Sequence, residues 1–275
     1  MSGTLFVVAT PLGNLEDLSV RVLDTLKKVD IIAAEDTRIS MKLAQQAGSA
    51  ARFKSLHQWN EKKETDFLIQ TLLEGKSIAL VTDAGTPAIS DPGFLLVAAA
   101  HALKIPVSPI PGPSAVVSAC SVSGFDCRRF VFIGFLPRKK SEIQDAFAGL
   151  ESFTVPVVFF ESPARILETV MLLEKILSPE TRLCLCKEIS KKFETVFQSS
   201  LSEIRETLEH SDLRGEWTGV LENVRVKPSV TDHSFPVHKT LEEVCAFFNV
   251  PRSTAAKILS LATGRTRQEL YKGHS

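Results

Sequence analysis

The stretch Ala79-Leu-Val-Thr-Asp-Ala-Gly-Thr-Pro-Ala-Ile-Ser-Asp-Pro-Gly93 decides the fold of this chain. It begins as a short apolar run, typical of a buried parallel strand, and continues into small, turn-forming residues. Gly85 and Gly93 permit backbone angles and close ligand approach that a Cβ atom would prevent, and Pro87 and Pro92 fix the turns. Ligands of open α/β sheets bind beyond the carboxyl ends of the strands, so we expect this loop to contact a small molecule.

The first half of the chain alternates short β-rich runs with segments of helical periodicity. This alternation predicts a doubly wound, parallel α/β layer. The expected strands are Leu5–Ala9, Ile31–Ala34, Arg52–His57, Ile78–Val81 and Val107–Ile110, and the expected helices are Leu18–Val29, Thr37–Ala47, Glu64–Leu73, Phe94–Leu103 and Ala115–Val122.

The pattern changes near Arg128, where a second α/β domain with a mixed sheet is expected. We place the domains at residues 1–123 and 124–225, a proline-containing linker at 226–236 and a small helical region at 237–275. In the second domain the expected strands are Phe130–Phe135, Val155–Phe160, Leu183–Glu188, Glu194–Gln198 and Glu216–Leu221, with helices at Ser141–Leu150 and Ala164–Leu177. The helical region is expected to hold Leu241–Phe248, Ser253–Thr263 with Ser253 as N-cap, and Thr266–Tyr271.

Composition points to a cytoplasmic protein without a global electrostatic bias. The 275 residues are 44% hydrophobic and carry a formal net charge of +0. Basic residues gather in Asp126–Lys140 and in the tail after Pro251, which is weak evidence for RNA unless a cleft lies nearby. Five cysteines without a C-x-x-C pair suit a reducing compartment, and Cys184 and Cys186 should face the same way in a strand. We expect no membrane-spanning segment and no signal peptide.

Several common chemistries have no motif in this sequence. It contains no G-x-G-x-x-G, no P-loop, no H-E-x-x-H or zinc-like Cys/His spacing, and no G-x-S-x-G elbow. What remains is an enzyme without a metal that holds a small organic cofactor through the backbone of its strand-end loops.

Two further loops and one charged segment are expected at the same sheet edge. The loops are Ala9-Thr-Pro-Leu-Gly-Asn-Leu15 and Ile110-Pro-Gly-Pro-Ser-Ala115, and the charged segment is Ala34-Glu-Asp-Thr-Arg38. The ionisable side chains after a buried strand indicate a functional site. The alternative is that Asp36 or Thr37 only caps the next helix.

Taken together, these motifs resemble the bacterial 16S ribosomal RNA 2′-O-ribose cytidine methyltransferases, a family of the tetrapyrrole methylase superfamily. The resemblance rests on A-T-P-x-G-N, A-E-D-T-R and D-A-G-T-P-x-I-S-D-P-G, with Glu161-Ser-Pro-Ala-Arg165 and Arg214-Gly-Glu216, and it extends through the helical tail. The chain has Lys187-Glu-Ile-Ser-Lys191 where such proteins tend to read Arg-Glu-Leu-Thr-Lys, and the change from Arg to Lys loses bidentate geometry.

The resemblance implies that S-adenosyl-L-methionine binds in a folded conformation between two α/β domains, with no metal ion. Carried over to this sequence, the cofactor-binding residues are Pro11, Leu12, Asp83, Gly85, Thr86, Pro87, Ile89, Ser114, Ala115, Phe160 and Ser162. Ser114 precedes an expected helix, whose N-terminus favours a carboxylate.

A ribose hydroxyl has a high pKa, so a group of the enzyme must accept its proton. The candidates are Glu35, Asp36, Glu188 and Lys191. We expect the Glu35–Asp36–Arg38 segment and Lys191 to face the acceptor, with Arg38 binding phosphate or ribose. Asp36→Ala should then abolish methylation and spare cofactor binding.

The implied partner is 16S rRNA, within an assembled small ribosomal subunit, and the implied state is a homodimer. RNA contacts are expected from Arg128–Lys140 and the helical tail. Two alternatives stay open at this point. One is a methyltransferase acting on a tetrapyrrole or corrin precursor, and the other is a non-catalytic RNA-binding protein with a vestigial cofactor site.

Overall fold

The computed structural model describes residues 2–148, 155–178, 181–222, 241–242, 245, 251–263 and 266–271. Two compact units account for them. The first comprises Met1–Val122 together with Cys186–Thr195, and the second comprises Ser123–Leu185 together with Val196–Ser275. The expected linker at 226–236 lies outside the described residues.

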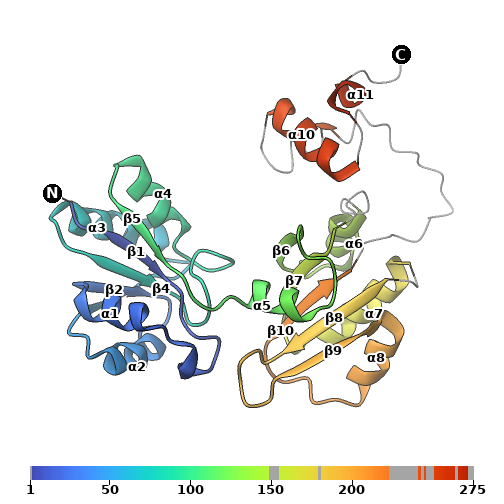
Figure 1. Cartoon of the computed structure of the whole chain (residues 1–275), viewed down its shortest axis with the longest axis horizontal. Helices are drawn as coiled ribbons and strands as arrows, with labels where there is room; N and C mark the ends of the chain where they lie inside the picture. Colours follow the sequence, from blue (N-terminus) through green and yellow to red (C-terminus); the bar gives the residue numbers. More distant parts are fainter. Residues whose placement is uncertain are drawn as a thin grey trace. The chain divides into compact units, whose positions relative to one another are not determined.

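The first unit is a five-stranded parallel sheet in the order β3-β2-β4-β1-β5 (Figure 1). Its strands are β1 Leu5–Val8, β2 Ile31–Ala34, β3 Arg52–Ser55, β4 Ile78–Val81 and β5 Val107–Ile110. Its helices are η1 Leu15–Asp17, α1 Val20–Lys28, α2 Thr37–Ala47, α3 Glu61–Leu73, α4 Phe94–Ala102 and α5 Ala115–Val122.

Both faces of this sheet are buried, which explains why its central strands are continuously apolar. In β4, Ile78 and Leu80 pack with α3 and α4 on one face, while Ala79 and Val81 pack with α1 and α2 on the other. The side chains of β2 alternate in the same way. A doubly wound α/β layer, as predicted, therefore brings every strand-end loop to one edge.

The second unit is built on a mixed sheet in the order β6-β7-β10-β8-β9. Strand β6 is parallel to β7, and β7 is antiparallel to β10, so the expected mixed sheet is confirmed. The strands are β6 Val131–Phe135, β7 Val157–Glu161, β8 Arg182–Lys187, β9 Thr195–Ser200 and β10 Trp217–Leu221, and the helices are α6 Lys140–Ala148, α7 Ile166–Ile176 and α8 Leu201–Glu209.

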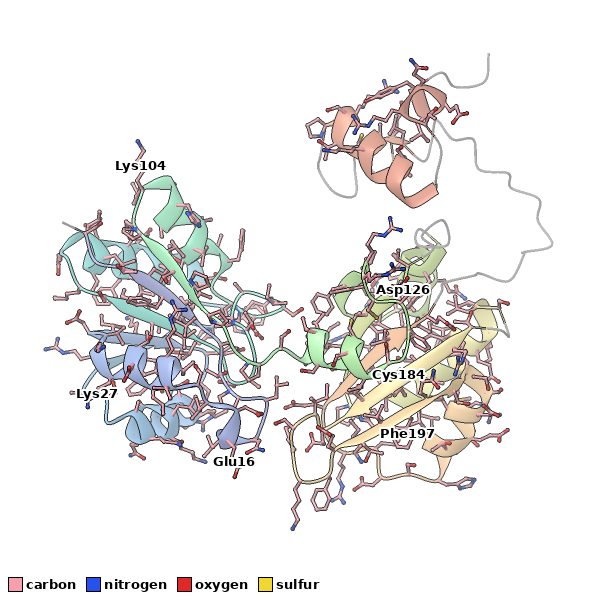
Figure 2. The ribbon with its side chains drawn as sticks, in the orientation of Figure 1. Glu16, Lys27, Lys104, Asp126, Cys184 and Phe197 are labelled. Carbon is pink, nitrogen blue, oxygen red and sulfur yellow. The ribbon has the colours of Figure 1, made fainter. Side chains whose placement is uncertain are left out.

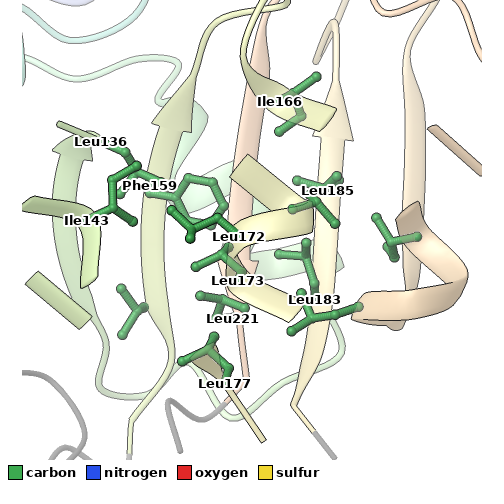
Figure 3. Packing of buried hydrophobic residues seen from close by; sticks show 14 of the residues in the cluster. Leu136, Ile143, Phe159, Ile166, Leu172, Leu173, Leu177, Leu183, Leu185 and Leu221 are labelled. Atoms are coloured by element: carbon green, nitrogen blue, oxygen red, sulfur yellow. The ribbon is translucent and has the colours of Figure 1, made fainter. Parts of the chain in front are cut away.

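One face of this second sheet forms a large apolar core with α6, α7 and α8 (Figure 3). Leu183 and Leu185 of β8 belong to this core. Cys184 and Cys186 alternate with them and are also fully buried, so they face the same way, as predicted.

A small apolar cluster holds the described part of the helical region. Leu241, Ala255, Ala256, Leu259 and Leu270 pack together, the last four on α10 Arg252–Thr263 and α11 Arg267–Tyr271. Most of the expected helix Leu241–Phe248 lies outside the described residues. The expected N-cap at Ser253 is wrong, because the Pro251 carbonyl already accepts from the Thr254 and Ala255 amides and the helix begins at Arg252.

Helix α8 is the one long helix of the described part that was not predicted from the sequence.

Within the described residues, no helix combines the length and the apolar character that a membrane span requires.

Candidate functional site

The first two strand-end loops of the first unit are joined by a pair of backbone hydrogen bonds. Thr10 N donates to Gly85 O at 2.8 Å, and Gly85 N donates to Thr10 O at 3.1 Å. The fully buried Thr10 hydroxyl also donates toward the Thr82 carbonyl at 3.1 Å. The loop after β1 and the loop after β4 therefore form one fixed structure.

The third loop is held to the second by a side chain. The Thr86 hydroxyl donates to Pro113 O at 3.1 Å. Gly85, with φ +83°, lies where an added Cβ would come 3.3 Å from Leu12 Cδ2. A Cβ on Gly112 would come 3.0 Å from the Ala9 Cβ. These glycines let the three backbones approach closely, which is the role the sequence predicts for Gly85.

Backbone strain is concentrated in the site loops. Among the described residues, five non-glycine positions have positive φ, and two of them, Ala88 at 63° and Ser90 at 68°, lie in the loop after β4. Two more, Glu188 and Ser190, lie between β8 and β9. Such conformations cost on the order of 1–3 kcal/mol each and gather at functional sites.

A group of carboxylates lies at the carboxyl ends of β2 and β4. The Thr82 hydroxyl donates to Glu35 Oε2 at 3.3 Å, and Asp83 Oδ1 accepts from the Asp36 amide at 3.1 Å. Burial, followed by the charge of Asp83, raises the pKa of Glu35. Burial likewise raises the pKa of Asp83. Burial together with the charges of Glu35 and Asp83 raises the pKa of Asp91 to about 6.

Asp36 differs from these carboxylates in both environment and role. It is the N-cap of α2, where its side chain accepts from the Arg38 amide, and it also receives the Arg38 guanidinium, with Nε at 3.0 Å from Oδ1. These hydrogen bonds lower the pKa of Asp36 to about 2. Asp36 therefore does cap α2, and the Arg38 side chain that it holds is 87% exposed.

The segment between β8 and β9 contributes Lys191 to the same unit. The alkyl chain of Lys191 covers Gly13, since a Cβ on Gly13 would come within 2.4 Å of Lys191 Cγ. Lys191 Nζ donates to Glu188 Oε1 at 2.9 Å, and the Ser190 hydroxyl donates to Asp17. The structure thus brings Lys191 to the first loop, next to Gly13.

The remaining predicted cofactor residues, Phe160 and Ser162, belong to the second unit. Next to them, the Glu161 carboxylate is fully buried and accepts from the Ser162 amide at 2.7 Å and from the Thr169 hydroxyl at 2.8 Å. Arg165 reaches the same carboxylate at 3.3 Å and donates to the carbonyls of Leu136 and Pro137. The Glu-Ser-Pro-Ala-Arg motif is therefore a structural support in this unit.

Residues 4–205 match the family of tetrapyrrole (corrin/porphyrin) methylases. The chain belongs to this family. Many relatives share the name ribosomal RNA small subunit methyltransferase I. That of Xylella fastidiosa is 38% identical over 274 residues, covering 98% of each chain. That of Pasteurella multocida is 38% identical over 274 residues, with 99% of this chain and 96% of the relative covered.

Solved structures of the same methylase fold support the assignment at the level of architecture. Diphthine synthase superimposes with a TM-score of 0.64 at 16% identity, covering 81% of this chain and 90% of that protein. A Thermus thermophilus uroporphyrin-III C-methyltransferase, solved with S-adenosyl homocysteine, gives 0.55 at 15% identity, covering 80% and 96%. The family that the motifs resemble is therefore confirmed, together with its α/β fold.

Two residues of this tetrapyrrole methylase site were missed from the sequence. Asp91 was read only as part of the glycine-rich motif. Glu61, at the start of α3, accepts from the amides of Gly93 and Leu95 at 2.8 and 2.9 Å and so caps α4 from another element. Such a long-range cap leaves no local signal. Among the described residues, no group of three or more His, Cys, Asp or Glu side chains is arranged to hold a metal ion.

Proposed function

We propose that this chain is an S-adenosyl-L-methionine-dependent methyltransferase that modifies the 2′-oxygen of a cytidine ribose in 16S ribosomal RNA. The support is twofold. Relatives named ribosomal RNA small subunit methyltransferase I are similar to it over nearly its whole length. The observation that carries the proposal is the joining of three strand-end loops by the Thr10–Gly85 and Thr86–Pro113 hydrogen bonds.

The residues of these loops fit the cofactor. The absence of a Cβ at Gly85 and Gly112 lets the three loop backbones pack together at the sheet edge where ligands of open α/β sheets bind. When bound, S-adenosyl-L-methionine supplies an electrophilic methyl group. In the first unit, the residues proposed to hold it are Pro11, Leu12, Asp83, Gly85, Thr86, Pro87, Ile89, Ser114 and Ala115. Phe160 and Ser162 are the residues proposed from the second unit.

Of the two carboxylates that follow β2, Glu35 is the better proton acceptor. Its pKa is raised by burial, so its carboxylate is more basic than an exposed one. The pKa of Asp36, lowered to about 2 by Arg38, makes Asp36 a weak base. We therefore assign Asp36 the task of orienting Arg38, whose exposed guanidinium suits an RNA phosphate or ribose.

Matched amide substitutions test this division of roles. Glu35→Gln should lower single-turnover methylation of unmethylated 30S subunits by about 100-fold or more, in the range of general base catalysis, and leave cofactor affinity in calorimetry nearly unchanged. Asp36→Asn keeps the helix cap, because Asn caps as well as Asp, so we expect a weaker effect, mainly on RNA affinity.

Asp36→Ala serves as the comparison that also removes the cap. It should lose about 1 kcal/mol of stability in addition to the RNA effect. Loss of turnover in Asp36→Asn with RNA affinity unchanged, together with retained turnover in Glu35→Gln, would instead move the base to Asp36, another of the sequence candidates.

The substrate form and the oligomeric state are also part of the proposal. An assembled small subunit is the proposed substrate, and labelled methyl transfer should favour 30S particles over free rRNA and over tetrapyrroles. The homodimer is checked by the molecular mass in solution.

A further inference from the structure

Strand β6 lies at an edge of the second sheet and divides its side chains between two faces. Val131 and Ile133 pack against the large core. Phe132, between them, lies on the opposite face, where its ring meets that of Phe160 edge-on at a centroid distance of 5.0 Å. Simple alternation would send the side chain of residue 135 to the core face with Val131 and Ile133.

An irregularity at Gly134 changes this direction. Phe132 pairs with Val158, but Phe135 pairs with Phe160, so β6 holds one residue more than β7 over this interval. Gly134 has φ +70°, a conformation that glycine adopts without strain. The bulge places Phe135 on the face of Phe132, and its ring lies 5.4 Å from that of Phe160 in an edge-on arrangement.

Phe135 is exposed despite its contact with Phe160. The residue is 60% accessible, so one large part of the ring faces solvent. Leu136 takes a place in the core and Phe135 is left largely in water, which forgoes most of the about 1.5–3 kcal/mol that burying such a ring contributes. A ligand that covers the ring would explain this arrangement.

Three basic residues come shortly after Phe135 in the sequence. Arg165 donates to the carbonyls of Leu136 and Pro137, so the backbone just after Phe135 is held in place. The next three residues are Arg138, Lys139 and Lys140, all exposed. An aromatic face beside basic side chains is the combination that binds single-stranded nucleic acid, by stacking on bases and attraction to phosphates.

We propose that Phe135 is a stacking platform for an unpaired base of the RNA substrate, with Arg138–Lys140 binding the adjoining phosphates. This inference rests on the proposed function and adds to it a base-binding residue. Charge complementarity selects RNA over an apolar partner, because the three cations follow the ring within five residues of the chain and an apolar surface that covered them would have to desolvate them.

The experiment compares two fluorescent 12-nucleotide RNAs, oligocytidine and a fully abasic strand of the same length, binding to the full chain. Phe135→Ala should weaken oligocytidine binding roughly tenfold and leave the abasic strand unaffected. Phe135→Trp should retain or strengthen binding. Phe135→Leu keeps an apolar side chain on Phe160 but lacks the flat face, so it should behave like Phe135→Ala even where the alanine variant is less stable.

Phe67→Ala is the matched control, because Phe67 is a half-exposed phenylalanine on α3 in the first unit. It should leave both affinities unchanged. Equal affinity of wild type and Phe135→Leu for oligocytidine would overturn the inference. So would a loss of S-adenosyl-L-methionine affinity with RNA binding intact, which would assign the ring to the cofactor. Failure of the wild type to methylate 30S subunits would instead contradict the proposed function, and the oligonucleotide comparison distinguishes the two.

Discussion

The carboxyl group of Asp91 lies close to Glu35 and Asp83 at the end of β4. Its pKa is raised from 3.8 to about 6, chiefly by burial and then by the charge of Glu35. The native state therefore keeps this proton to a higher pH than the unfolded chain does. The free energy of unfolding should fall as pH rises from about 4 to about 6, and this loss persists above pH 6.

Asp91→Asn removes that ionisation and tests it. Relative to wild type, the variant should gain stability between pH 4 and pH 6, by on the order of 1 kcal/mol because partial exposure screens the interaction. Calorimetric unfolding at pH 4, 5, 6 and 7 measures the difference. Asp66→Asn, at an exposed position on α3, is the control and should show no such trend. A constant difference between Asp91→Asn and wild type across this range would contradict the assignment.

Asp91 shows which features of the site can be predicted from the sequence and which cannot. The loop around it could be predicted, because glycine, proline and a preceding apolar strand are local signals. The raised pKa could not, since it depends on burial in the folded chain and then on Glu35, which is 56 positions earlier in the chain. For Asp36 the same applies: the sequence offers a base or a cap, and only the contact with Arg38 favours the cap.

At the level of elements, Arg165 connects three segments of the second unit. Its guanidinium contacts the Glu161 carboxylate on β7 and the carbonyls that follow β6. Arg165→Lys keeps the charge but loses the planar fork, so it should lower the free energy of unfolding by about 2 kcal/mol. Arg214→Lys is the control, because Arg214 holds Asp212 with the same fork but is 90% exposed; it should cost less than about 0.5 kcal/mol.

Tryptophan fluorescence measured in a denaturant series reports mainly the unfolding of the second unit. Trp217 is buried in the second unit, donates to Leu213 O at 2.9 Å and stacks on Phe197, which is labelled in Figure 2. The other tryptophan, Trp59, is 90% exposed in the first unit and should change little. Identical midpoints for Arg165→Lys and Arg214→Lys would show that the fork contributes nothing beyond its charge.

Elements differ in how well the sequence predicts them, for physical reasons. Strands β2 and β4 have the expected bounds because parallel strands buried on both faces are short, apolar runs flanked by turn residues. Helix α8 was missed although its signals are present: Ser200 caps it, Glu203 follows three residues later, and Leu201, Ile204 and Leu208 form its buried face. The bulge at Gly134 has no local signal apart from the glycine itself.

For the molecule as a whole, the chain order does not follow the division into units. Cys186–Thr195 belongs to the first unit although it separates Leu185 from Val196 of the second. The sequence predicts a turn between two strands there, but not the contact of Lys191 with Gly13, which joins positions 178 residues apart. Unit membership depends on such distant contacts and is therefore the hardest feature to predict from one sequence.

RNA binding by a chain of zero net charge must depend on local charge. Arg138, Lys139 and Lys140 are exposed, and the ion pairs of Lys139 with Glu142 and of Lys140 with Glu168, both at 2.9 Å, are open to solvent and weak enough for phosphate to replace. Changing all three to Gln should lower affinity for single-stranded rRNA fragments and reduce the slope of log affinity against log salt by about 2, given roughly 0.7 per phosphate contact. The control changes Lys27, Lys28 and Lys76 to Gln. It removes the same amount of charge from the edge of the first sheet where the strands begin. Fluorescence titrations between roughly 50 and 300 mM salt, about a sixfold range that includes the physiological value, should give different slopes for the two triple variants. Equal slopes would place the RNA-binding charge elsewhere.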